Sequence, residues 1–335
     1  MMGRLTPGRK VESFAVEAVG THNSVPPFTT AVSPGVAVTI HAIRITGEKG
    51  GPSVYVGGGQ HGDEIGGMAA AWEVAQAVDH RKLKGRLVVV PLQNPAAFKF
   101  RTRLNPFDPI DPDWIYPGDP SGTHYQRTRF ILNNLASECD CVMDLHTAGI
   151  SGANSGYVYV PPETGNGSGK RSLELGLAFG GDRIIRGKSE ETYGWKVSSA
   201  MPFAAVREGR LGLYPEAGQG GGMMPEKRFV DYLVTGTLNV LKSMHMLEGD
   251  IVAQGERIVV DPSSEKSVKA PREGLLKTLV SPGQNVSKGQ VIAEIRRIPK
   301  GLVKVKAPIA GNVIFLHRLG SVGEGESIAT LSPGK

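Results

Sequence analysis

Three side chains that commonly bind first-row metals stand at two turns of the sequence. His61 and Glu64 lie three residues apart in a glycine-rich turn that follows a short apolar strand expected at 54–56. His146 closes a second apolar segment, Val-Met-Asp-Leu-His. Two neighbouring ligands and a third from a distant strand end are typical of a catalytic zinc site with a fourth position open for water. We therefore expect one Zn²⁺ per chain, although these ligand types also accept Co²⁺ or Mn²⁺.

A fourth candidate is Glu216, which follows the apolar segment 212–215 and precedes a run of glycines. A carboxylate at a strand end can stand near an activated water and take its proton, provided that burial brings its pKa near the working pH. The alternative is a helix cap or an ordinary loop carboxylate. We expect Glu216 to lie just after a strand, as His61 and His146 do.

Cations follow the apolar run 87–92, in the segment 94–108. Arg101 and Arg103 in this segment could polarise a carbonyl group or stabilise a tetrahedral oxyanion. A loop arginine is also commonly just solvated, and the spacing alone does not choose between the two.

The elements that must position these groups alternate between strands and helices. Such alternation predicts an α/β fold with a mixed, largely parallel sheet flanked by helices, and a site at the carboxyl ends of the strands. The segment from about 10 to 57 is β-rich. We expect strands at 36–40, 54–56, 87–92, 141–145, 183–185 and 212–215, and helices at 68–78, 125–136, 171–179 and 228–246.

A boundary is expected near residue 248, where the helical patterns stop. Beyond it, Lys269–Gly274 matches Lys306–Gly311, so the tail contains an internal repeat. Short strands with glycine turns, duplicated once, predict a small all-β barrel or sandwich made of two similar halves. The predicted domains are thus 1–248 and 249–335.

Composition limits the classes of partner. The 335-residue chain carries a net charge of +6 with no block of Lys and Arg interleaved with aromatic residues, which argues against nucleic-acid binding. No apolar run approaches a membrane span. Cys139 and Cys141 would face opposite sides of a strand, so they are expected as reduced thiols in a cytoplasmic protein. A homo-oligomer is possible.

These motifs together resemble the succinylglutamate desuccinylase/aspartoacylase family, a branch of the zinc carboxypeptidase-like superfamily. The resemblance covers about residues 30–330 and rests on His61–Glu64, the segment 94–103, Tyr116–Gly118, Asp144–Thr147 and Glu216–Gly218. It implies that His61, Glu64 and His146 bind zinc, that Glu216 activates water and that Arg103 polarises the scissile carbonyl. The implied reaction is hydrolysis of an amide, which releases a carboxylic acid from a small N-acylated amine or amino acid.

One departure from the family pattern concerns the substrate. Asp113 and Trp114 stand where the family usually has an Asn-Arg pair whose arginine holds a substrate carboxylate, and they cannot make a bidentate clamp. Either the substrate lacks that carboxylate, or another cation such as Arg101 or Arg127 replaces the clamp. Asp113 could also favour a cationic substrate.

The tail resembles a lipoyl or biotinyl carrier domain, and Lys300 falls near the position of the modified lysine in those carriers. Its sequence context is not the one that modifying enzymes read, so no prosthetic group is expected. Two other functions remain open at this point: a carboxypeptidase-like peptidase, and a non-catalytic metal-binding or carrier protein.

Overall fold

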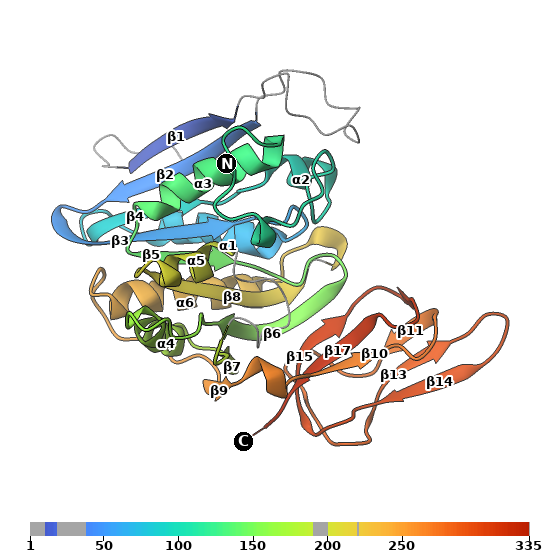
Figure 1. Cartoon of the computed structure of the whole chain (residues 1–335). Coiled ribbons are helices and arrows are strands. Elements are labelled where there is room, and N and C mark those ends of the chain that lie inside the picture. Colours follow the sequence, from blue (N-terminus) through green and yellow to red (C-terminus); the bar gives the residue numbers. More distant parts are fainter. Residues whose placement is uncertain (1–10, 19–37, 190–199, 220, 335) are drawn as a thin grey trace.

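One long mixed sheet runs through the part of the chain that the computed structural model describes, namely residues 11–18, 38–189, 200–219 and 221–334. Its central strands pair in parallel in the order β4, β3, β5 and β8, whereas β1–β2, β2–β4 and β6–β8 are antiparallel pairs (Figure 1). The bounds are β1 Val11–Ala18, β2 Val38–Thr46, β3 Lys49–Gly58, β4 Lys84–Val90, β5 Cys141–Leu145, β6 Gly152–Tyr159, β7 Arg183–Ile185 and β8 Leu211–Gln219.

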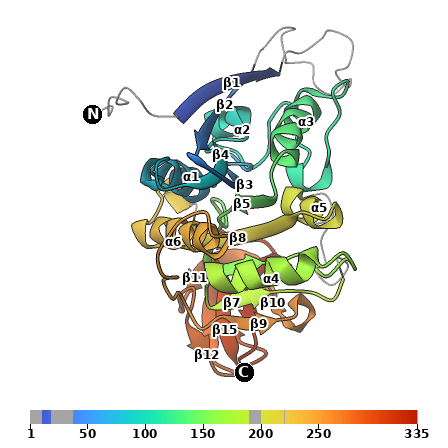
Figure 2. The same ribbon diagram turned by 90° about the vertical axis from the view of Figure 1, so that its left-hand side faces the viewer.

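Helices cover both faces of this sheet (Figure 2). Because successive strand residues point to opposite faces, Val54 and Val56 of β3 enter one core while Tyr55 enters another. Val74 of a helix on the first face and Leu132 of a helix on the second complete these two cores. The first face carries α1 Ile65–Ala77, α4 Ser168–Phe179 and α6 Lys227–Ser243, and the second carries α3 His124–Ser137 and α5 Met201–Arg207. The expected mixed α/β sheet flanked by helices is confirmed.

A short helix, α2 (Pro95–Phe100), lies inside the segment that the sequence presents as a loop. Asn94 caps it, since its side-chain oxygen accepts a hydrogen bond from the Ala97 amide at 3.2 Å, and Pro95 occupies the first helical position. Six residues are too few to show a helical period, so only these capping signals could have revealed it. Within the described residues, no helix is long and apolar enough to cross a membrane.

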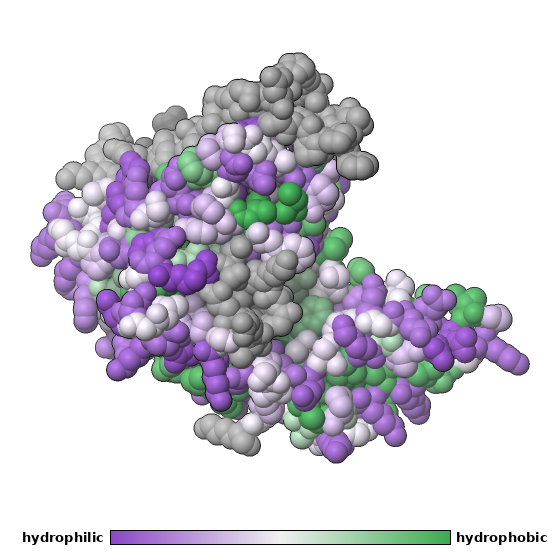
Figure 3. Space-filling view, viewed as in Figure 1, coloured by the Kyte–Doolittle hydropathy of each residue, from purple (hydrophilic) through white to green (hydrophobic). Residues whose placement is uncertain are grey.

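The tail after residue 257 consists of short strands and one 3-10 turn. Its strands form two sheets around a shared apolar core, and β15 pairs with β6 so that one of them continues the central sheet. In the space-filling view the tail projects from the body as a narrower arm (Figure 3). The bounds are β9 Ile258–Val260, β10 Lys266–Lys269, β11 Gly274–Thr278, β12 Asn285–Val286, β13 Val291–Arg296, β14 Leu302–Lys306, β15 Gly311–His317, β16 Ser321–Val322 and β17 Ser327–Ser332.

The internal repeat of the sequence corresponds to equivalent contacts in the tail. Ala270 donates its amide to the carbonyl of Glu326, and Ala307 donates to Gln290, both at 2.8 Å. Both alanines lie between two strands, β10 and β11 in one half and β14 and β15 in the other. The two halves therefore share one local architecture, while a closed carrier-like barrel stays a prediction.

Candidate metal centre

His61, Glu64 and His146 meet at the carboxyl edge of the central sheet. β3 and β5 are parallel neighbours paired up to Gly58 and Leu145, so the residues after each strand emerge side by side. One ligand atom from each of the three lies within 4.8 Å of the others, and all three residues are buried. Glu64 lies between the imidazoles, with Oε1 at 2.9 Å from Nδ1 of His61 and Oε2 at 2.9 Å from Nδ1 of His146.

Glycines allow the close packing that brings these residues together. A Cβ on Gly62 would lie 2.1 Å from the carbonyl carbon of Ala97, where α2 packs over the turn. A Cβ on Gly67 would lie 2.2 Å from the carbonyl oxygen of Leu145, where α1 crosses the end of β5. Side chains at either position would push the turn away from the strand end that carries His146.

Each histidine faces a second carboxylate with its other ring nitrogen. Nε2 of His61 lies 3.3 Å from Oδ1 of Asp111, and Nε2 of His146 lies 3.6 Å from Oδ2 of Asp144. Burial lowers the pKa of His146, but Glu64 and Asp144 outweigh it and the net shift is well upward. Burial alone would raise the pKa of Glu64, yet the two imidazoles hold it well below its usual range. A carboxylate behind a ligating histidine orients the ring and increases its basicity.

The donor set fits a zinc ion. Two imidazole nitrogens and one carboxylate oxygen are ligands that Zn²⁺ takes in catalytic sites. Nδ1 of His61 is buried and makes no hydrogen bond in the described part of the chain, although it points toward Glu64. A second group, His61 with Asp111 and Asp113, also has closely spaced ligand atoms. Its Asp113 is less available, because Gln60 and Tyr214 donate hydrogen bonds to its two oxygens at 2.7 and 2.9 Å.

Glu216 lies inside β8, not after it, which corrects the expectation from the sequence. β8 starts parallel to β5 and then continues antiparallel to β6, where Tyr157 pairs with Glu216. The backbone of Glu216 also pairs with that of His146 in an isolated β-bridge. Its carboxylate therefore stands next to the triad of candidate ligands, His61, Glu64 and His146. Nδ2 of Asn154 donates to its Oε2 at 2.7 Å. Burial, reinforced by the nearby charge of Glu64, raises the pKa of Glu216 to about 8.

Arg103, not Arg101, faces the candidate ligands. Its Nη1 lies 2.9 Å from Oε1 of Glu64 and its Nη2 lies 3.4 Å from Oδ2 of Asp111. The side chain is 48% exposed, so it borders both the triad and the solvent. Arg101 ends α2 in a left-handed conformation, with φ of 56°, and its side chain is exposed. The structure thus separates two residues that spacing alone could not distinguish.

The remaining predicted substrate contacts do not gather at one point. Asp113 is only 2% exposed and both of its oxygens are engaged, which leaves its predicted contact with a substrate without geometric support. Trp114 is 54% exposed. Arg127 donates a hydrogen bond to the carbonyl of Gly122, in the loop before α3.

Tyr214 is a site residue that the sequence reading did not single out. Its ring stacks on His146 with centroids 4.1 Å apart and planes 11° apart. It stands two residues before Glu216 on β8, and strand alternation places residues i and i+2 on one face. This strand alternation is the sequence signal from which Tyr214 could have been predicted as a neighbour of the site. The further chain from Asp113 through Gln60 to the buried Arg129 has no local sequence signature.

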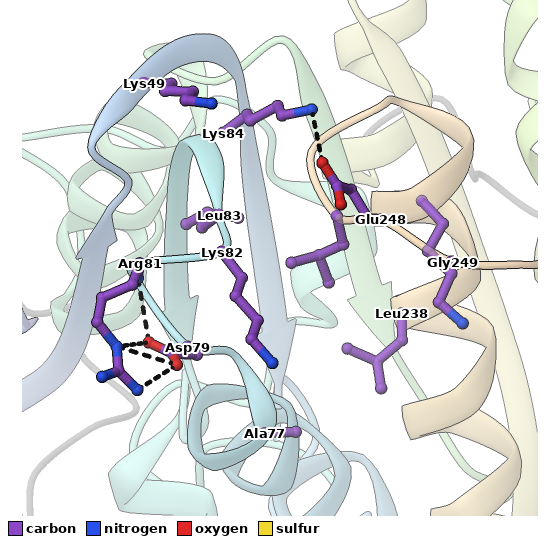
Figure 4. Close-up of a pocket in the computed structure, with 12 residues that line it drawn as sticks. Lys49, Ala77, Asp79, Arg81, Lys82, Leu83, Lys84, Leu238, Glu248 and Gly249 are labelled. Carbon is purple, nitrogen blue, oxygen red and sulfur yellow. Dashed lines mark hydrogen bonds and ion pairs between the residues drawn. The ribbon is translucent and has the colours of Figure 1, made fainter.

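A cavity of about 680 Å³ at the opposite, amino-terminal end of β3 and β4 is not part of this centre (Figure 4). Basic residues outnumber acidic residues in the lining of this cavity, and its two acidic residues form ion pairs with lining cations. Arg81 contacts Asp79 at 2.6 Å, and Lys84 contacts Glu248 at 3.4 Å.

Comparison with known proteins places this chain in a family. Residues 50–244 match the succinylglutamate desuccinylase/aspartoacylase catalytic domain. An N-alpha-acetyl-L-2,4-diaminobutyric acid deacetylase from Halomonas elongata is 27% identical over 292 residues, which are 84% of this chain and 82% of that protein.

Solved structures show the same fold along most of the chain. A succinylglutamate desuccinylase from Silicibacter sp. TM1040 superposes with a TM-score of 0.82 at 21% identity, covering 97% of this chain and 95% of that one. The product-bound ectoine utilization protein EutE from Ruegeria pomeroyi gives a TM-score of 0.81 at 23% identity, with the same coverage of 97% and 95%.

Proposed function

Since the chain belongs to the succinylglutamate desuccinylase/aspartoacylase family, we propose that it is a zinc-dependent amide hydrolase. It would release a carboxylic acid from a small N-acylated amine or amino acid. The observation that carries the proposal is the buried group of three ligand atoms within 4.8 Å, with Glu216 and Arg103 beside it. The named substrate of the Halomonas relative, an N-acetylated diamino acid, supports this substrate class.

His61, Glu64 and His146 would hold the zinc ion, and Asp111 and Asp144 would keep the two imidazoles in place. A bound zinc ion supplies a Lewis acid that polarises the amide carbonyl and makes water easier to ionise. The stacking of Tyr214 on His146 restrains the ring from the side of β8. These contacts fix the ligands before any substrate arrives.

Glu216 would move the proton. Its carboxylate accepts a proton from the attacking water while the water oxygen bonds to the amide carbon. When the tetrahedral intermediate collapses, the C–N bond breaks and Glu216 returns that proton to the leaving nitrogen. Asn154 holds one carboxylate oxygen at 2.7 Å, which leaves the other oxygen for the water.

Arg103 would stabilise the negative charge that develops on the carbonyl oxygen. Its guanidinium presents several N–H donors in a fixed plane at the exposed side of the triad. Preorganised donors at such a position act in the transition state without costly rearrangement.

We also propose the organisation that the sequence predicts, with a catalytic domain over 1–248 and a carrier-like β tail over 249–335 that holds no prosthetic group. Support comes from the separate apolar core of the tail and its two equivalent halves. β15 of the tail pairs with β6, where Phe315 lies opposite Asn154, so the tail also braces the strand that carries the partner of Glu216.

The test combines metal analysis with a hydrolysis screen. Purified protein should contain close to one zinc per chain and should release a carboxylic acid from N-acyl amino acids, N-acyl amides or mono-acylated diamines. His61→Ala should lose both zinc and activity, because it removes a ligand. A zinc-loaded protein that cleaves none of these substrates would refute the proposed function.

A further inference from the structure

A groove of about 610 Å³ lies at the carboxyl edge of the sheet, the edge that also carries the candidate metal ligands. Segments that follow four different strands of the sheet line it. These contribute Ile65 after β3, Phe98, Lys99 and Arg101 after β4, Ile150 after β5, and Met223 after β8. Ile65 directly follows the candidate ligand Glu64, and the Ile150 amide donates to Oδ2 of Asp63 at 2.8 Å. The groove is therefore held by the same turns that hold the metal ligands.

The walls of the groove are apolar and exposed. Phe98 and Ile150 are 41% and 42% exposed, although folding normally buries such side chains. Together with Ile65 and Met223 they form an apolar surface between the helix and the loops. Contiguous exposed apolar surface of this kind commonly marks a binding site.

Two cations, Lys99 and Arg101, line the groove, and none of the described residues that line it is acidic. Both side chains are exposed, and in the described part of the chain no carboxylate forms an ion pair with either. The cavity at the amino-terminal end of β3 and β4, here called the far cavity, differs in this respect. There Asp79 and Glu248 form ion pairs with two of the lining cations. An anion entering the groove would therefore meet uncompensated positive charge.

The backbone at Arg101 is in the left-handed region, at φ of 56°. A residue other than glycine pays about 1–2 kcal/mol for this conformation. A left-handed residue commonly ends a helix, where glycine is the usual choice, and strain of this kind is also found at functional sites. Glycine would relieve the strain, so the arginine side chain itself is the feature that needs an explanation.

Two other arginines of the described part of the chain are engaged elsewhere. Arg129 is buried and donates to Gln60, and Arg127 donates to the Gly122 carbonyl. Trp114, at the position of the usual arginine clamp, offers no charge.

We propose that this groove binds the arm of the substrate beyond the scissile amide, and that it recognises an apolar chain ending in a carboxylate. Arg101 would pair with the carboxylate, Lys99 would add charge, and Phe98 and Ile150 would enclose the chain. This assignment of the substrate class rests on the proposed hydrolase function. Arg101 thereby takes over, from a different segment, the clamp that Trp114 cannot provide.

The primary test is calorimetric titration of the zinc-loaded protein with hexanoate and with hexanamide, which has the same chain without the charge. Hexanoate should bind more tightly than hexanamide to the wild type. Arg101→Gln should weaken hexanoate about 10- to 100-fold, as expected for loss of a charge-assisted hydrogen bond, and leave hexanamide unchanged. Phe98→Ala should weaken both ligands.

Arg101→Gly separates binding from folding. It should melt at the same temperature as the wild type or higher, because it relieves the strained φ, yet bind hexanoate as weakly as Arg101→Gln. Lys82→Gln, at an exposed lysine of the far cavity, is the matched control and should change nothing. Hexanoate binding that is equal to that of hexanamide, or that survives both Arg101 variants, would overturn the proposal.

Kinetics then distinguish this inference from the function on which it rests. With N-acetyl-6-aminohexanoate and its carboxamide, Arg101→Gln should raise KM for the acid and leave kcat nearly unchanged, because the contact is made equally in the ground and transition states. Equal hydrolysis of the acid and the carboxamide by the wild type sinks the groove assignment alone. Hexanoate binding through Arg101 without any hydrolysis sinks the proposed function alone.

Discussion

Two partly buried carboxyl groups, Glu216 in β8 and Glu265 before β10, have the same raised pKa of about 8 in very different surroundings. Burial is the main cause at both. Glu216 stands beside two imidazoles and a guanidinium and accepts a hydrogen bond from Asn154. At Glu265 the like charge of Asp261 adds to burial in raising the pKa, and Oε1 of Glu265 is buried with no partner among the described residues. A raised pKa therefore records burial, whereas convergent partners mark the site.

The largest loss of activity is expected when Glu216, at the carboxyl edge of the sheet, is replaced. Glu216→Gln keeps the shape and the Asn154 contact but cannot accept a proton, so kcat should fall about 10²- to 10⁴-fold. Zinc content should stay the same, because Glu216 is not among the candidate ligands. Glu265→Gln is the paired control, and its kcat/KM should stay within about twofold of the wild type. If Glu216→Gln and Glu265→Gln lost similar activity, the claim that only Glu216 belongs to the active site would be contradicted.

Glu265→Gln should instead change stability in a pH-dependent way. The folded protein keeps a proton on Glu265 up to a pKa of about 8, whereas the unfolded chain releases it near the usual glutamate pKa of 4.5. Between these values the folded state binds more protons, so rising pH lowers the free energy of unfolding. A shift from 4.5 to about 8 sets an upper limit of about 5 kcal/mol, and contact with water reduces this, so we expect about 3 kcal/mol at pH 9.

Urea unfolding at pH 5, 7 and 9 measures how much Glu265 changes the free energy of unfolding as the pH rises. Glu265→Gln should match the wild type near pH 5 and be more stable at pH 9, because the amide carries no charge to bury. Glu273→Gln makes the same chemical change at an exposed position of the tail and should show no such trend. A difference between Glu265→Gln and wild type that stays constant with pH would contradict the burial explanation.

The same contrast explains what could be predicted from the sequence. The meeting of His61, Glu64 and His146 could be predicted because each belongs to a turn after an apolar strand, and parallel strands bring such turns to one edge. The predicted position of Glu216, just after a strand, was wrong. The strand β8 pairs first with β5 and then with β6, and nothing in its local sequence pattern marks the change. β3 and β5 keep the same neighbouring strands up to their ends, so their ends could be read from the local pattern, whereas the end of β8 could not.

Long-range side-chain contacts were not predictable. Asp111 reaches His61 across 50 residues, and Asn154 reaches Glu216 across 62 residues. Such pairs depend on which distant segments become neighbours in the folded chain, which periodicity does not encode. The role of Arg101 is a related case, because its left-handed backbone and its place in the groove are visible only in three dimensions.

A smaller effect is expected from the carboxylates behind the histidines. Asp111→Asn and Asp144→Asn should each weaken zinc binding about tenfold, because the imidazoles lose a partner that orients them and increases their basicity. Competition with a chromogenic chelator at fixed pH measures this. Asp119→Asn, in an exposed loop, is the control. Unchanged affinity in both variants would show that burial alone, without these partners, holds the rings.

The smallest effect is expected at the far cavity, where Lys84→Met removes the contact of Nζ with Glu248 at 3.4 Å. The glutamate is 87% exposed, and such pairs contribute about 0–1 kcal/mol, so stability should change by less than about 0.5 kcal/mol. Hydrolysis should be unaffected, although α1 connects the two ends: Glu64 precedes its first turn and Ala77 lines the cavity. A tenfold loss of kcat/KM would mean that α1 transmits a change between them, and that the carboxyl edge does not work independently of the amino-terminal end.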